Sequence, residues 1–309
     1  MGEPLLAGRE FFESALRLQR ELRLSGQWIQ NSLQTNGLLL DEEWLSFLSR
    51  NSFTVGVSVD APGDVHDAAR VDVNRRGTFR EVVAKLRGLK HAGIDHGVIL
   101  VARPDHVHRQ KEILSCMREI GVSSFDIHPS CGNGMSSSFD ISPSQFSSLC
   151  CELFDQWLNE GAGIAIPMFE DFLRYLSGRQ PKTCYHAGRC TAIIAIEADG
   201  AVVPCTRPFE SYWTFGNVLE QSLSSIIAGS RFQEFARRDL SAQHSRASCR
   251  WFGVCHNGCP QHRRSTIGSV SKATIDGVGI YCDCFGQPSV GWPAVYDHIE
   301  DRVRGTLGI

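Results

Sequence analysis

The sequence predicts an α/β fold in which a set of parallel strands and helices is followed by a small domain built around cysteines. Three features of the 309 residues lead to this prediction. Strand and helix patterns alternate through the first 160 residues, the pattern changes between 161 and 183, and eight of the 12 cysteines lie between 184 and 284. Helices that separate consecutive strands indicate βαβ units, and such units form a parallel sheet.

The alternation in the first half consists of short strand patterns separated by helix patterns. The strand patterns cover 29–34, 53–59, 98–101 and 124–128, and the helix patterns cover 10–24, 41–49, 78–91, 108–119 and 143–159. In the second strand pattern, Val55, Val57 and Val59 alternate with smaller or polar residues, as strands do. The last helix pattern opens with Ser142-Pro143-Ser144-Gln145, a capping box with proline at the first helical position.

The pattern change gives the predicted domain boundaries. Gly161-Ala162-Gly163 and Pro181 frame a connecting segment over 161–183. Short strands, turns and cysteines are expected over 184–290, and a closing helix is expected within 291–309. The sequence therefore predicts an α/β core at 1–160, the connecting segment, a cysteine-rich domain and a C-terminal helix.

Composition narrows the functional classes. The hydrophobic content of 42% and the charged content of 21% are ordinary for a soluble globular protein, and the net charge of −3 is not that of a general nucleic-acid binder. No run of 18 apolar residues predicts a membrane helix, and residues 1–10 lack the basic start of a signal peptide. We therefore expect a cytoplasmic protein without nucleic-acid or membrane partners, whose cysteines are thiols or metal ligands.

The cysteines fall into three groups. They are Cys184-x5-Cys190 with Cys205, then Cys249-x5-Cys255-x3-Cys259, and last Cys282-x-Cys284. A proline directly after a cysteine, as at Cys259-Pro260, also occurs in ferredoxin-type sites, whereas the Cys-x2-Cys pair of many zinc sites is absent from the sequence. The spacing favours iron–sulfur ligation, with a zinc site and incidental buried cysteines as the alternatives.

In this order and spacing, the cysteines resemble the SPASM domain of radical S-adenosylmethionine enzymes. Upstream motifs fit the same family, and they are Gly2-Glu3-Pro4, Gln34-Thr35-Asn36-Gly37, Ser58-Val59-Asp60, His66-Asp67 with Arg70, and Gly77-Thr78-Phe79. The subfamily that the chain resembles most is the anaerobic sulfatase-maturating enzymes. The resemblance implies that 1–160 is part of a (β/α)6 radical SAM barrel and that 184–290 is the SPASM domain.

The resemblance also implies a ligand set for two auxiliary [4Fe-4S] clusters. Cys184, Cys190, Cys205 and Cys259 would ligate the first cluster. Cys249, Cys255 and Cys282 would ligate the second, whose fourth position holds Arg246, a residue that cannot bind iron. Either Cys284 replaces the lost ligand, or the second cluster is incomplete or absent.

A second cofactor implied by the resemblance is S-adenosyl-L-methionine. Gly2 and Glu3 match positions that meet its amino group, and Ser58 and Arg70 match positions that hold its ribose and carboxylate. The family's radical chemistry needs a Cys-x3-Cys-x2-Cys loop, and the 309 residues contain none. We therefore expect an N-terminally truncated sequence that lacks the first strands of the barrel and is inactive by itself.

The activity implied by the resemblance is oxidation of a Ser or Cys of a client polypeptide to formylglycine, with flavodoxin or ferredoxin as the electron donor. The family's catalytic Asp corresponds to Thr206, so the catalytic residue is unknown, and Asp171, His186 and Asp199 are the candidates to replace it. The alternatives are a radical SAM maturase of a ribosomal peptide and a non-catalytic iron–sulfur binding or partner protein. A zinc-loaded structural module is a further alternative.

Overall fold

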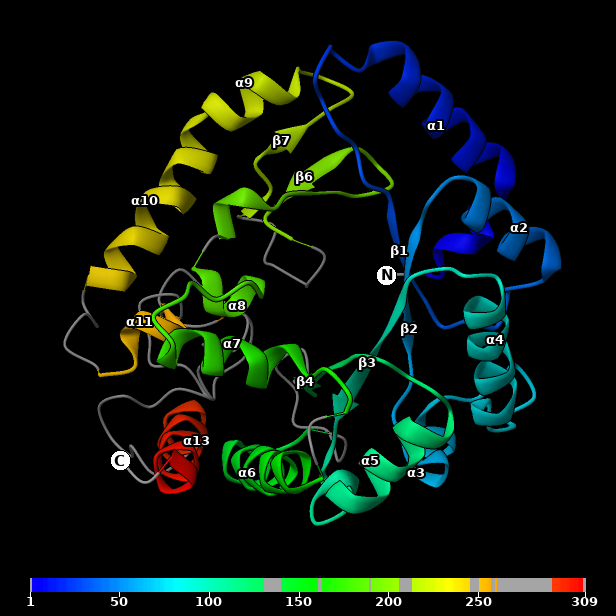
Figure 1. Ribbon diagram of the computed structural model, residues 1–309. Helices are drawn as coiled ribbons and strands as arrows, with labels where there is room; N and C mark the ends of the chain where they lie inside the picture. Colours follow the sequence, from blue (N-terminus) through cyan, green and yellow to red (C-terminus); the bar gives the residue numbers. More distant parts are fainter. Residues whose placement is uncertain are drawn as a thin grey trace. The chain divides into compact units, whose positions relative to one another are not determined.

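The computed structural model describes residues 2–130, 140–160, 163–188, 190–205, 213–244, 250–256, 259 and 291–307 (Figure 1). Of the predicted site residues, Thr206, Arg246, Cys249, Cys282 and Cys284 lie outside this part of the chain. The chain divides into two compact units, unit 1 with residues 1–129 and 156–167, and unit 2 with residues 130–155 and 168–309. The domain boundaries expected at 160 and 184 stay a prediction.

Unit 1 contains the predicted parallel sheet. Its strands are β1 (Ser32–Thr35), β2 (Thr54–Ser58), β3 (His96–Ala102) and β4 (Phe125–Pro129), and they pair in the order β1-β2-β3-β4. All three pairings are parallel, with Leu33 opposite Val55 and Val57 opposite Val98. Figure 1 shows the four strands side by side, so their carboxyl ends share one edge. The prediction of a parallel sheet is confirmed.

Helices connect the strands as βαβ units require. α2 (Glu42–Arg50) follows β1, α3 (Gly63–Ala69) and α4 (Phe79–His91) follow β2, and α5 (Gln110–Glu119) follows β3. The side chain of Asp41 accepts a hydrogen bond from the backbone N–H of Trp44, which caps α2 as its sequence predicts. The sequence did not predict α3, because seven residues are too few to establish a helical period.

The core of unit 1 forms where alternate strand residues meet the helices. Val55, Val57 and Leu100 of the strands are at most 1% exposed, as are Leu86 and Leu89 of α4. Burying a side chain of this size stabilises the fold by roughly 1.5–3 kcal/mol. This apolar layer holds the strands at fixed register and therefore fixes the positions of the polar residues at their carboxyl ends.

The N-terminal part of unit 1 consists of η1 (Pro4–Ala7) and α1 (Arg9–Leu22). Phe12 of α1 packs edge-to-face against Trp44, Phe47 and Phe53, with ring centroids 5.4 to 6.4 Å apart. β1 begins at Ser32, three residues later than the predicted strand, because its pairing with β2 covers only Ser32 to Thr35. In the part of the chain that the structure describes, β1 pairs with β2 alone.

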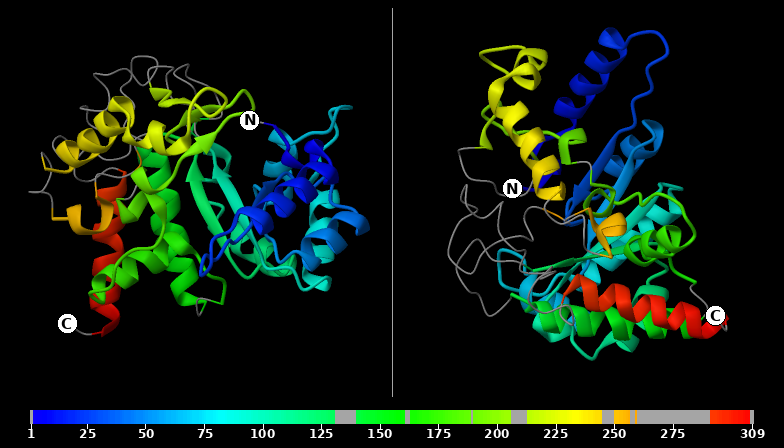
Figure 2. Two further views of the ribbon diagram at one scale, coloured as in Figure 1. Left: turned by 90° about the horizontal axis from the view of Figure 1, so that it is seen from above. Right: turned by 90° about the vertical axis from the view of Figure 1, so that its left-hand side faces the viewer.

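Unit 2 combines long helices with very short strands. α6 (Pro143–Asn159), whose first thirteen residues belong to this unit, lies beside α13 (Trp292–Leu307) (Figures 1 and 2). Phe146 and Trp292 meet edge-to-face at 5.3 Å, and Asp155 pairs with Arg302 at 2.7 Å. α7 (Pro167–Leu176) occupies part of the segment that the sequence assigned to a connection, and the sequence did not predict it.

The cysteine-bearing part of unit 2 is built from small elements. They are α8 (Cys184–Ala187), η3 (Cys190–Ala192), β5 (Ala195–Ile196), β6 (Ala201–Val203), β7 (Gly216–Asn217), α9 (Leu223–Ala228), α10 (Ser230–His244) and α11 (Phe252–Cys255). The three strands form an antiparallel sheet in the order β5-β6-β7. Short strands and turns were predicted here, but α9 and α10 were not. None of the described helices has both the length and the hydrophobicity that a membrane-spanning helix requires.

Candidate functional site

The first candidate site lies at the carboxyl end of β1 and begins with Glu3. Its carboxylate accepts hydrogen bonds from the Thr35 hydroxyl at 2.7 Å and from the backbone N–H of Asn36 at 2.9 Å. The same carboxylate accepts from the backbone N–H of Leu5 at 3.2 Å, which caps η1. Glu3 is therefore fixed at the edge of the sheet, 32 residues from Thr35 along the chain. Gly2 is exposed, and a Cβ atom there would meet nothing within 4 Å.

Ser58 lies at the same edge, at the end of β2. Its hydroxyl accepts a hydrogen bond from the Gln34 side-chain amide at 3.2 Å. The Gln34 side chain crosses Gly56, where an added Cβ would come within 2.0 Å of the Gln34 Oε1 atom. Gly56 therefore makes room for the bond between Gln34 and Ser58. The sequence signal for this role was a glycine inside an otherwise valine-rich strand.

Arg70 is held by a buried carboxylate. Its Nε and Nη2 atoms donate to the two carboxylate oxygens of Asp60 at 2.7 and 3.2 Å. The backbone N–H of Val101 also donates to Asp60, which is 2% exposed, at 2.9 Å. The bidentate geometry fixes the plane of the guanidinium group. Asp60 thus takes the side of Arg70 that a bound carboxylate could otherwise use.

The side chain of His66 contacts the backbone of Asp60, the partner of Arg70. It is fully buried, its Nδ1 accepts from the backbone N–H of Asp60 at 3.2 Å, and its Nε2 lies 3.1 Å from the Thr78 hydroxyl. Burial lowers the pKa of His66 to about 4, and the positive charge of Arg70 acts in the same direction. The ring is therefore neutral at physiological pH, which the hydrogen bond accepted by Nδ1 requires.

The second candidate site comprises the cysteines of unit 2. We call residues 184–205 and 250–259, as far as the structure describes them, the cysteine region. Cys184 opens α8 and is exposed, whereas Cys190, Cys205 and Cys259 are half-buried and Cys255 is buried. All five carry thiols rather than disulfides. Their residue type and their state both suit metal or cluster ligation.

Two segments of the cysteine region meet between α8 and α11. The backbone carbonyl of His186 and the Nδ1 atom of His256 are 2.6 Å apart. Gly188 has a φ of 61°, and a Cβ atom there would lie 2.6 Å from the Cβ of His256, so this close approach requires glycine. The contact brings the chain after Cys184 next to the chain after Cys255.

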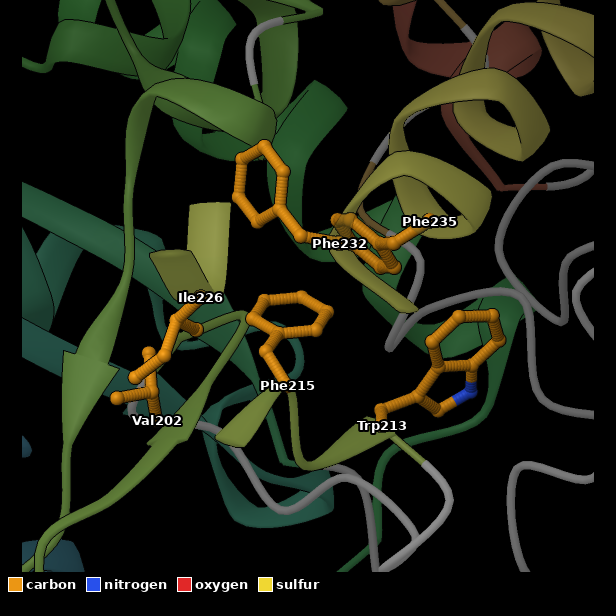
Figure 3. Close-up of a cluster of buried hydrophobic side chains, with 6 residues drawn as sticks. All are labelled: Val202, Trp213, Phe215, Ile226, Phe232 and Phe235. Carbon is orange, nitrogen blue, oxygen red and sulfur yellow. The ribbon is translucent and has the colours of Figure 1, made fainter. Parts of the chain in front are cut away.

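A buried apolar cluster positions a further part of the cysteine region. Figure 3 shows its six members, which are Val202, Trp213, Phe215, Ile226, Phe232 and Phe235. Cys190 packs against this cluster. Val202 is the middle residue of β6, three residues before Cys205. Cys190 and the strand that leads to Cys205 therefore pack in the same apolar core.

Within the described residues, no three His, Cys, Asp or Glu side chains converge as the ligands of one metal ion would. A cubane cluster does not require such convergence, because each of its four thiolates binds a different iron atom and the sulfur atoms lie further apart. Cys184, Cys190, Cys205 and Cys259 are all free thiols, as cluster ligation requires.

The residues considered as replacements for the base differ in their surroundings. Asp199 is exposed in the turn between β5 and β6, where it accepts from the backbone N–H of Ala201 at 3.0 Å. Asp171 and His186 are buried, at 2% and 1% exposure. Burial raises the pKa of Asp171, but its interactions with His186, Thr183 and two backbone N–H groups outweigh burial and lower the pKa. Such a carboxylate is a weak base.

Two family models match the chain. The model of the radical SAM superfamily matches residues 1–116, and that of the SPASM iron–sulfur cluster-binding domain matches residues 184–260. The first therefore covers the candidate site at the carboxyl ends of β1 and β2, and the second covers the cysteine region. The predicted resemblance to these two families is confirmed.

Curated relatives and solved structures extend the match over most of the chain. The cysteine-type anaerobic sulfatase-maturating enzyme of Clostridium perfringens (strain 13 / Type A) is 29% identical over 271 residues, 85% of this chain and 73% of that protein. The serine-type enzyme of Bacteroides thetaiotaomicron is 26% identical over 284 residues, 85% of this chain and 68% of that protein. The structure of native anSMEcpe with bound AdoMet and Cp18Cys peptide matches with a TM-score of 0.86 at 25% identity, and the match covers 99% of this chain and 84% of that one.

A more distant structure shares the fold alone. Streptococcus suis SuiB bound to S-adenosylmethionine matches with a TM-score of 0.55 at 12% identity, and the match covers 85% of this chain and 62% of that one. The cofactors of the family are [4Fe-4S] clusters and S-adenosylmethionine, and the predicted α/β fold and cofactor classes agree with these matches. The chain therefore combines a region of the radical SAM superfamily with a SPASM iron–sulfur cluster-binding domain, as a radical SAM oxidoreductase does, and its relatives include the anaerobic sulfatase-maturating enzymes.

Proposed function

We propose that this protein is a radical SAM oxidoreductase of the sulfatase-maturation type, which oxidises a Ser or Cys of a client polypeptide to formylglycine. The observation that carries the proposal is the structural match to anSMEcpe, which covers 99% of this chain at a TM-score of 0.86. That structure holds AdoMet and the Cp18Cys peptide. Both cysteine-type and serine-type maturating enzymes are relatives of this chain, so either residue is a candidate substrate.

The residues at the carboxyl ends of β1 and β2 fit part of S-adenosylmethionine. When bound to a reduced cluster, this cofactor supplies the radical that takes a hydrogen atom from the substrate. The Glu3 carboxylate would accept a hydrogen bond from the ammonium group, and the Ser58 hydroxyl would meet the ribose. Arg70 would use its remaining N–H groups for the carboxylate, because Asp60 holds Nε and one side of Nη2.

The cysteine region fits an auxiliary [4Fe-4S] cluster. Cys184, Cys190, Cys205 and Cys259 would ligate the first cluster, and their thiols are accessible or half-buried in the structure. Cys255 would ligate the second with Cys249 and Cys282, and either Cys284 takes the place of Arg246 or the second cluster is incomplete or absent. In this role the thiolates would hold clusters that accept an electron from the substrate, and a flavodoxin or ferredoxin would be the electron donor of the enzyme.

The proposal does not assign a base. Thr206 has a hydroxyl group that cannot accept a proton near neutral pH, and the low pKa of Asp171 disfavours that carboxylate as well. We further infer that these 309 residues do not cleave S-adenosylmethionine by themselves, because none of their cysteines has the Cys-x3-Cys-x2-Cys spacing. The second candidate function is a non-catalytic iron–sulfur partner protein, which would use the thiols of the cysteine region without radical chemistry.

The deciding experiment uses protein isolated anaerobically from its own source, because its mass and activity can then be measured on the same sample. It would be reduced, supplied with S-adenosylmethionine and incubated with client peptides that carry Ser or Cys. The proposal expects 5′-deoxyadenosine and an aldehyde in the peptide, detected by mass spectrometry and by hydrazide capture. Cofactor binding without cleavage would favour the partner protein, and a crosslinked peptide without an aldehyde would favour a ribosomal-peptide maturase.

A further inference from the structure

Asp171 holds the backbone immediately before Cys184. This carboxylate, on α7, accepts from the backbone N–H of Lys182 and of Thr183, each at 2.7 Å, and from the Thr183 hydroxyl at 2.5 Å. Breaking the hydrogen bonds that a buried carboxylate accepts costs free energy, because the carboxylate and its donors would be left unsatisfied. The position of the chain at residue 183 is therefore fixed by α7.

Tyr296 holds the same segment from α13. Its hydroxyl lies 2.9 Å from the Nε2 atom of His186, and the Nδ1 atom of His186 lies 3.7 Å from the Asp171 carboxylate. Because a carboxylate can only accept, we assign the ring proton to Nδ1, on the side of Asp171, which leaves Nε2 to accept from the tyrosine hydroxyl. The tyrosine ring stacks on Phe172 at 5.0 Å and on Trp292 at 5.9 Å, which leaves its hydroxyl little freedom.

α8 cannot hold this geometry by itself. The helix has four residues, and a single turn has no independent stability in water. The two contacts flank Cys184, one at Thr183 and the other at His186, while Cys184 itself is exposed. Contacts that fix the backbone on both sides of a metal ligand keep that ligand in its binding geometry.

We propose that Asp171 and Tyr296 are positioning residues for the Cys184 thiolate in the first auxiliary cluster. This inference rests on the ligand set of the proposed function. Tyr296 is 110 residues from His186, so its part in the site emerges only from the fold. Neither residue touches the cluster in this account, and both act through the backbone of residues 182–187.

The test compares two variants with two matched controls. Asp171→Asn removes the charge and replaces one of the two acceptor oxygens with a donor NH2 group, and Tyr296→Phe removes the hydroxyl that contacts His186. Asp301→Asn and Tyr175→Phe change the same residue types where the described part of the chain supplies no hydrogen bond to the side chain. Each full-length protein would be reconstituted anaerobically with iron and sulfide, and its folding checked by circular dichroism. Three quantities would be measured, namely the rate of cluster loss to a chelator, the electron paramagnetic resonance spectrum of the reduced cluster and its reduction potential.

We expect Asp171→Asn and Tyr296→Phe to lose the cluster about tenfold faster than the wild type, since partners of metal ligands are worth roughly 10–100-fold in affinity. Their spectra and potentials should shift, and both controls should match the wild type. If Asp171→Asn fails to fold, Tyr296→Phe decides the matter alone. Folded variants with wild-type loss rates and spectra would overturn the positioning role.

A third variant tests separately the ligand set on which this inference rests. Cys184→Ala should remove about one cluster's worth of iron and sulfide. If it does so while Tyr296→Phe behaves as the wild type, only the positioning role fails. If Cys184→Ala binds the wild-type amount of iron with an unchanged spectrum, Cys184 is not a ligand, and both the ligand set and the positioning role are wrong.

Discussion

The sheet of unit 1 and the cysteine region of unit 2 are stabilised by different means. The sheet has strands of up to seven residues in parallel register, covered by helices whose apolar side chains are almost fully buried. The cysteine region has strands of two and three residues and helices of four, so its backbone offers few regular hydrogen bonds. The buried apolar cluster and the contacts of Asp171 and Tyr296 supply part of the stability of this region, and we expect iron–sulfur ligation to supply the rest.

The largest effect expected from this comparison follows removal of the metal. Chelation of iron from the anaerobic protein should increase hydrogen exchange in residues 184–205 and leave β2 and β3 protected, because only the first region depends on ligands. Hydrogen-exchange mass spectrometry of the loaded and stripped protein measures this directly. Equal protection of residues 184–205 in both states would show that the region folds without a cluster.

The second effect is a matched pair of core truncations. Phe215→Ala in the buried apolar cluster and Phe47→Ala in unit 1 each remove a buried ring, at 7% and 4% exposure, and each should lower the free energy of unfolding by about 3–5 kcal/mol. Only Phe215→Ala should also reduce bound iron, because the proposed ligand Cys190 packs against the buried apolar cluster that contains Phe215. Denaturation and iron content measure the two consequences. Loss of iron in Phe47→Ala as well would mean that the two regions are not independent.

The contrast between the regions also explains what the sequence could predict. The parallel sheet was predictable because Val55, Val57 and Val59 repeat with the period of a strand, and because helices of ordinary length separate the strands. The cysteine spacing indicated a cluster domain without specifying its secondary structure. α7 and α10 were missed, and the pairing of His186 with Tyr296 spans 110 residues, a distance over which no local pattern acts. Arg70 was predicted for the cofactor, yet its bidentate bond to Asp60 depends on the fold.

A third and smaller effect is the pH dependence of the stability of unit 1, through His66. The pKa of His66 in the folded protein, about 4, is below the ordinary value of 6.5, so the unfolded state binds the proton more readily. The contribution of His66 is complete above pH 6.5 and is lost as the pH falls towards 4, by on the order of 2–3 kcal/mol at about 1.4 kcal/mol per pKa unit. Unfolding of wild type and His66→Gln between pH 7 and pH 4 checks this. Parallel pH curves for the two proteins would contradict it.

The smallest effect concerns thiols that have no proposed ligand role. Burial raises the pKa of Cys116 to about 11 and that of Cys151 to about 12, with nearby carboxylates acting in the same direction. At pH 8, Cys116 should react with iodoacetamide about a hundredfold more slowly than free cysteine and Cys151 about a thousandfold more slowly, because the thiolate is the nucleophile. Timed alkylation and peptide mapping of the iron-free protein measures the rates. Rapid labelling of either residue would show that its thiol is not shielded as the structure indicates.

The central claim is that Cys184, Cys190, Cys205 and Cys259 hold one auxiliary cluster. The most direct measurement is the iron and acid-labile sulfide bound per chain by wild type and Cys205→Ala after anaerobic reconstitution, with Cys116→Ala as the control outside the ligand set. We predict that Cys205→Ala loses about one cluster, roughly four irons and four sulfides, and that the control loses none. Unchanged iron and sulfide in Cys205→Ala, or zinc without sulfide in the wild type, would contradict the account.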